Sequence, residues 1–163
     1  MSDPIEILER RLKAVLDQEA TTTGLHFFCQ IGGYDDPLGI ITFQVSGSGK
    51  ALLSWRREDD DVDLWTLQFS DEDYHQFVRL LMTHRFWTAS PPRRGRDEDD
   101  EINIHLRLSA QDIGTYKGVQ FWNSEVHDYQ VLRKVMEPLC KLIQSISYDE
   151  ISDEVLDEIL PSS

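Results

Sequence analysis

Residues 102–109 read Ile-Asn-Ile-His-Leu-Arg-Leu-Ser, so apolar and polar side chains alternate without a break. Successive side chains of a β-strand point to opposite faces of its sheet, and this segment must bury one face and wet the other. A sheet with that property is typically antiparallel and covered on one side only. The segment therefore constrains the architecture of the whole domain as well as its own conformation.

Helical and strand patterns around this segment predict an α+β domain. Asp3 and Pro4 begin a first helix, and Ser70 begins a second. A third helix is expected over residues 125–146. Runs of period two predict strands at residues 25–31, 39–45, 50–57, 62–69, 102–109 and 114–122.

The expected fold is thus an antiparallel sheet of five or six strands with helices packed on one face, in the order α-β-β-β-β-α-β-β-α. We assign this single α+β domain to residues 1–147 and an acidic amphipathic C-terminal tail to residues 148–163.

Acidic residues dominate the charge of the chain. Thirty acids face sixteen bases, a formal net charge of −14, and sixteen of the acids fall at residues 58–63, 97–101 and 149–158. This charge disfavours nucleic acid, because Lys and Arg drive phosphate binding, and it favours a protein partner with a basic surface. Solubility alone is the alternative explanation. The first two runs are expected to be a turn between strands and the acidic half of a solvated loop.

The sequence carries no recognisable catalytic, nucleotide or metal motif. Residues 47–50 (Gly-Ser-Gly-Lys) resemble the end of a phosphate loop but join two predicted strands, which favours a hairpin. The alternate acids of residues 59–63 lack the Gly and Glu that an EF-hand loop requires. The five histidines show no zinc-ligand spacing, and no G-x-S-x-G elbow is present. We therefore predict no catalytic residue, metal or cofactor.

Cys29 and Cys140 are far apart in the sequence, and both fall on predicted core faces. Two such thiols are expected to be reduced and buried, which favours a cytoplasmic location. The N-terminal residues do not resemble a secretory signal, and no apolar stretch approaches the roughly 20 residues that cross a bilayer. We expect no contact with a membrane.

The wet face of the last two predicted strands is the first candidate for a binding site. Aromatic and Arg side chains on such a face are the residue types that anchor protein interfaces. An ordinary solvated face, or one covered by the first helix, is the alternative. The candidate residues are His105, Arg107, Tyr116, Gln120 and Trp122. Neighbouring strands are expected to add Thr42, Gln44, Ser54, Arg56, Thr66 and Gln68.

The acidic tail is the second candidate, because its apolar residues recur at helical spacing. An acidic amphipathic helix can dock into an apolar groove beside basic residues of a partner. It can equally pack on its own domain or on a twin subunit, or stay disordered. Its apolar residues are Ile151, Val155, Leu156, Ile159 and Leu160.

We expect a non-enzymatic protein-interaction module, on the basis of the missing catalytic motifs, the clustered acids and the amphipathic tail. In its order of elements the chain resembles the type III secretion chaperones. That resemblance implies a homodimer that holds an extended effector segment against its sheet and helices. An acidic inhibitor or immunity-type protein that covers a basic active site is a second hypothesis. A hydrolase that uses scattered Asp, Glu and His is a third.

Overall fold

The computed structural model describes residues 3–33, 36–57, 61–98 and 100–161. Its helices are α1 (Pro4–Leu16), α2 (Asp71–His84), α3 (Gln130–Ile146) and α4 (Asp153–Ile159). Its strands are β1 (Leu25–Gly32), β2 (Ile40–Ser46), β3 (Lys50–Arg56), β4 (Val62–Gln68), β5 (Asn103–Ala110) and β6 (Thr115–Trp122). Single turns of 3-10 helix lie at Phe86–Thr88, Gln111–Ile113 and Asn123–His127.

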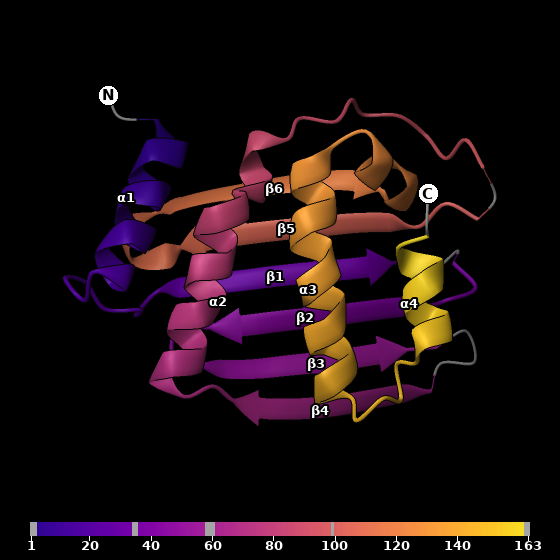
Figure 1. Ribbon diagram of the computed structural model, residues 1–163, viewed down its shortest axis with the longest axis horizontal. Coiled ribbons are helices and arrows are strands. Elements are labelled where there is room, and N and C mark those ends of the chain that lie inside the picture. Colours follow the sequence, from indigo (N-terminus) through magenta and orange to yellow (C-terminus); the bar gives the residue numbers. More distant parts are fainter. Residues whose placement is uncertain (1–2, 34–35, 58–60, 99, 162–163) are drawn as a thin grey trace.

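The six strands form one antiparallel sheet in the order β4-β3-β2-β1-β5-β6. All four α-helices lie on the same side of it, with α2 and α3 crossing the middle of the sheet (Figure 1). The α+β class, the helices on one face and the predicted order of the elements up to α3 are therefore confirmed. The hairpin expected at residues 47–50 is also present, since the N–H of Gly49 donates to the carbonyl of Ser46.

Both predicted N-caps are formed. The Asp3 carboxylate accepts the N–H of Ile5 at 2.9 Å, and the Ser70 hydroxyl accepts the N–H of Asp73 at 3.1 Å. Each bond satisfies one of the amide groups that the first turn of a helix leaves without an internal partner. Two short sequence patterns thus fix where α1 and α2 begin.

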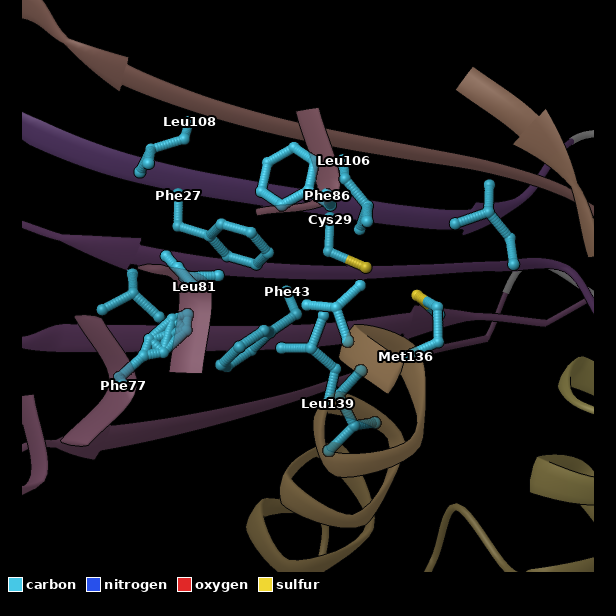
Figure 2. Close-up of a cluster of buried hydrophobic side chains, with 14 of the residues drawn as sticks. Phe27, Cys29, Phe43, Phe77, Leu81, Phe86, Leu106, Leu108, Met136 and Leu139 are labelled. Atoms are coloured by element: carbon cyan, nitrogen blue, oxygen red, sulfur yellow. The ribbon is translucent and has the colours of Figure 1, made fainter. Parts of the chain in front are cut away.

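The core lies between the helices and the inner face of the sheet, and aromatic rings fill its centre. The Phe27 ring meets Phe43, Phe77 and Phe86 edge to face, with centroids 6.3, 5.1 and 6.2 Å away. Figure 2 shows these rings beside Leu81, Leu106 and Leu108. Because Phe27, Phe43, Phe77 and Phe86 come from β1, β2, α2 and the segment after α2, this cluster ties the helices to the sheet.

The predicted strand ends agree with the structure to within one residue, but the predicted start of the third helix is wrong. The third helix begins at Gln130 instead of residue 125, because the preceding residues form a 3-10 turn in which Glu125 accepts the N–H of Trp122. Phe69 follows β4 instead of ending it, and Leu67, which points to the same side of the sheet as Trp65, remains 43% exposed. An edge strand has a neighbour on one side only, so inward-pointing residues on it are covered less. Residues 58–60 of the expected acidic turn lie outside the described residues.

Candidate functional site

The strand register places the five candidate residues of β5 and β6 on one face of the sheet. His105 lies opposite Gln120, and Trp122 and Tyr116 lie opposite Asn103 and Ser109. This face is turned away from the helices, because the alternate residues of the same strands are buried in the core. We call it the open face. It is not covered by α1, which lies with the other helices on the opposite side of the sheet (Figure 1).

Two adjoining hollows bring these residues together at the β6 edge of the open face. The first, of about 460 Å³, is lined by His105, Arg107, Tyr116 and Gln120. The second, of about 340 Å³, contains Trp122 and shares Gln120 with the first. Arg93 lines both hollows, so the loop between α2 and β5 forms their common wall.

Ring and cation contacts set the chemistry of the first hollow. The guanidinium carbon of Arg107 lies 4.2 Å from the centroid of the Tyr116 ring, which is 59% exposed. His105 meets the ring of Phe28 edge to face at 5.8 Å. Burial lowers the pKa of His105, and the neighbouring charge of Arg107 lowers it further. Both effects favour the neutral form of His105, and Arg93, Arg107 and Lys117 supply positive charge around this hollow.

The second hollow depends on a loop that is firmly anchored. Arg94 makes two hydrogen bonds to Glu101, at 3.0 and 2.7 Å, and its carbonyl accepts the indole N–H of Trp122 at 3.2 Å. Glu101 is only 4% exposed and also accepts the hydroxyl of Ser124. The hydrogen bonds from Arg94 hold the pKa of the Glu101 carboxyl well below its usual range, although burial acts in the opposite direction.

The expectation that residues 97–101 are wholly solvated is therefore wrong for Glu101. A carboxylate removed from water remains ionised only where opposite charge and hydrogen-bond donors surround it. Arg94 and Ser124 provide these groups, together with the backbone N–H groups of Asp97 and Glu98.

No outward-facing position of the six strands is occupied by an Asp or a Glu. The register defines these positions, and the side chains include three bases and two histidines. The outward residues are His26, Phe28, Gln30, Gly32, Ile40, Thr42, Gln44, Ser46, Lys50, Leu52, Ser54, Arg56, Val62, Leu64, Thr66, Gln68, Asn103, His105, Arg107, Ser109, Tyr116, Gly118, Gln120 and Trp122. The six residues that the sequence led us to expect from neighbouring strands, from Thr42 to Gln68, are all among these outward residues.

Sequence reasoning missed the apolar members of this face. Phe28 and Leu52 are half-buried there, and Val62 and Leu64 are 53% and 65% exposed. The sequence could have shown this for Phe28, because the alternation that places Phe27 in the core necessarily turns Phe28 outward. The open face thus combines exposed apolar side chains with a small excess of positive charge.

The structure places the tail residues against the core of their own domain. Ile151 and Ile159 are fully buried, and Val155, Leu156 and Leu160 are partly buried against the same core. Two polar contacts hold the segment in place. The N–H of Ile151 donates to the hydroxyl of Ser147, and the Asn123 amide donates to the carbonyl of Glu158. The apolar stripe of the tail is therefore used within the chain.

The described residues give little support to a metal site, a reactive thiol or a membrane-spanning helix. Within them, no group of three or more His, Cys, Asp or Glu side chains is placed to hold a metal ion. Burial raises the pKa of the Cys140 thiol to about 12 and that of Cys29 further still, so neither is a ready nucleophile. In the same residues, no helix is long and apolar enough to span a bilayer.

No model of a known protein family matches the sequence, and no curated protein matches it either.

Proposed function

We propose that this chain is a non-enzymatic protein-interaction module that binds its partner through the open face of the sheet. The observation that carries the proposal is the lack of carboxylates at outward-facing positions of the strands, in a chain with 30 acids among 163 residues. A face that served only solubility would be expected to hold several of these acids. A surface kept free of them suits recognition, because unpaired charges at the centre of an interface are costly.

The β5–β6 end of the face has the side chains of an interface anchor. Arg107 and Tyr116 stack on each other beside a hollow, and Trp and Tyr with Arg are the residues that dominate binding energies. Arg107, Arg56 and Lys50 give the face a positive character. It therefore favours a partner surface that is neutral or acidic there.

The cytoplasm is the location that we propose for this interaction. Cys29 and Cys140 are both free and buried, and such thiols are typical of proteins in a reducing compartment.

Reversal of one charge on the open face tests the proposal. The partner is first isolated on the wild-type chain and identified by mass spectrometry, and its Kd is then measured by calorimetry with purified components. The Arg107→Glu variant is expected to bind at least about tenfold more weakly, because it reverses the charge of an anchor residue. Arg107 is exposed, so the change should leave folding intact, which circular dichroism checks.

Lys134→Glu is the matched control, since Lys134 is exposed on α3, on the other side of the molecule. It makes the same change in net charge and is expected to keep the wild-type affinity. Equal affinity for the two variants would contradict the open-face proposal. A partner that proves to be a second copy of this chain would replace the hetero-interaction by a homodimer, and sedimentation of the purified protein distinguishes the two.

A further inference from the structure

The strand β4 forms a free edge of the sheet. It pairs with β3 alone, and the N–H of Phe69 and the carbonyl of Asp61 mark its bonds to that neighbour. Because peptide groups alternate in direction along an antiparallel strand, the odd-numbered residues of β4 bond to β3. The N–H and C=O groups of Val62, Leu64, Thr66 and Gln68 therefore point away from the sheet. No backbone bond within the described part of the chain reaches them.

This edge is unusually apolar for one exposed to water. Val62, Leu64 and Leu67 are 53%, 65% and 43% exposed, and every residue of β4 is at least partly exposed. Natural edge strands are normally protected by Lys, Pro or inward-pointing charges. Within β4 the only such residue is Asp63, at one end. The middle of the strand is left open to pairing.

Acidic side chains flank the far end of the strand. Helix α2 begins directly after β4, and its first turn carries Asp71, Glu72 and Asp73, all exposed. Figure 1 shows this turn beside the end of β4. At the other end, Asp61 and Asp63 precede or begin the strand, and Arg57 pairs with Asp63. Arg57 offsets the charge of Asp63, whereas three exposed acids lie together at the α2 end.

We propose that the β4 edge binds an extended peptide segment of another protein, with alternating apolar residues and basic residues at its N-terminal end. Addition of a strand would pair the free peptide groups of β4, and main-chain bonds give such complexes their affinity. Every pair of neighbouring strands in this sheet is antiparallel. An antiparallel guest would have its N-terminal end beside Asp71, Glu72 and Asp73, where basic side chains are complementary.

A second copy of this chain fits the edge less well. Two β4 strands paired about a twofold axis would place Asp61, Asp63 and Arg57 of each copy, two acids against one base, beside the three acids of residues 71–73 of the other. Like charges so placed are destabilising. The proposed binding edge is separate from the Arg107–Tyr116 end of the open face, because β4 and β6 are opposite edges of the sheet.

Synthetic peptides test the proposal directly. The probe is Arg-Arg-Ser-Val-Thr-Val-Thr-Val-Ser with a fluorescent label, and its binding to the full chain is followed by anisotropy. We expect saturable binding that weakens as salt is raised, because the charges at this end are exposed. The same sequence beginning Glu-Glu, and one with the two arginines moved to the C-terminal end, are expected to bind at least about tenfold more weakly.

Variants of the chain locate the site. Leu64→Lys introduces the residue that guards natural edges and is expected to reduce peptide affinity at least about tenfold. Thr66→Pro removes an outward N–H without removing a bond to β3, and it should act in the same direction. Two controls should leave peptide binding unchanged. They are Arg107→Glu and Tyr116→Lys, the latter at a residue of β6 that is about as exposed as Leu64. Unfolding in urea confirms that each variant is folded.

Three results would overturn this inference. They are a probe that does not saturate, equal binding of the Arg-Arg and Glu-Glu peptides, and unchanged binding by both Leu64→Lys and Thr66→Pro. A wild-type chain that sediments as a dimer and becomes a monomer in Leu64→Lys would also overturn it, since a second copy would then occupy the edge. None of these results bears on the effect of Arg107→Glu on the open-face partner.

Discussion

A chain that ends at Ser147 is expected to lose roughly 3–6 kcal/mol of its free energy of unfolding. The deletion removes Ile151 and Ile159, which are both fully buried, and each buried side chain of this size contributes roughly 1.5–3 kcal/mol. It also leaves the Asn123 amide without the carbonyl of Glu158. Because whole domains are stable by only about 5–15 kcal/mol, the loss is a large part of the total. Urea unfolding followed by circular dichroism measures it.

Single substitutions separate the contribution of packing from that of chain length. Ile159→Ala is expected to cost about 2–5 kcal/mol, because it opens a cavity in a packed core. Glu154→Ala changes an exposed residue of the same helix and should shift stability by less than about 0.5 kcal/mol. If the shortened chain unfolded at the wild-type urea concentration, the packing of α4 on the core would be contradicted. A loss of partner binding on truncation alone would not identify the tail as a docking element.

Replacement of Phe27 by Ala is expected to destabilise the protein by about 3–5 kcal/mol. The Phe27 ring is 2% exposed and makes edge-to-face contacts with three other rings from separate parts of the chain. Each such pair contributes beyond the burial of area alone. The cavity would lie at the junction of the sheet with α2, where the Phe77 ring packs against that of Phe27 (Figure 2).

The neighbouring residue provides a matched control. Phe28 lies on the open face, is only partly buried, and makes one ring contact, to His105. Phe28→Ala is expected to cost only about 1 kcal/mol, the order of a cross-strand pair. Equal losses of stability for the two variants, measured by urea unfolding, would mean that both faces of β1 are covered. That result would contradict the existence of an open face.

The fold could be predicted because its main determinants are local. The alternation at residues 102–109 specifies a sheet with one wet face, and Asp3 and Ser70 specify where helices begin. The errors arose where a distant contact decides the outcome. Leu67 has the pattern of a buried residue but lies on an edge strand. The order of the strands in a sheet cannot be deduced from the sequence of any single strand. Glu101 has an acidic neighbourhood in sequence but is buried by Arg94 and Ser124.

The candidate site was predictable only in part for the same reason. Alternation within β5 and β6 was sufficient to place His105 and Trp122 on one face. The lack of acids at the outward positions of all six strands becomes visible only when the register aligns residues such as Phe28 and Leu64 with them. The helical spacing in the tail was detected, but the sequence left open which surface it would cover. Burial of Ile151 shows that this surface is the core of its own domain.

Hydroxyl-radical footprinting of the chain alone and with its purified partner tests whether the open face is the surface that binds the partner. Tyr116 on the open face and Tyr148 after α3 are 59% and 86% exposed, so both should be oxidised readily in the free protein. Binding through the open face should slow the oxidation of Tyr116 and leave that of Tyr148 unchanged. Protection of Tyr148 with no protection of Tyr116 would contradict the account.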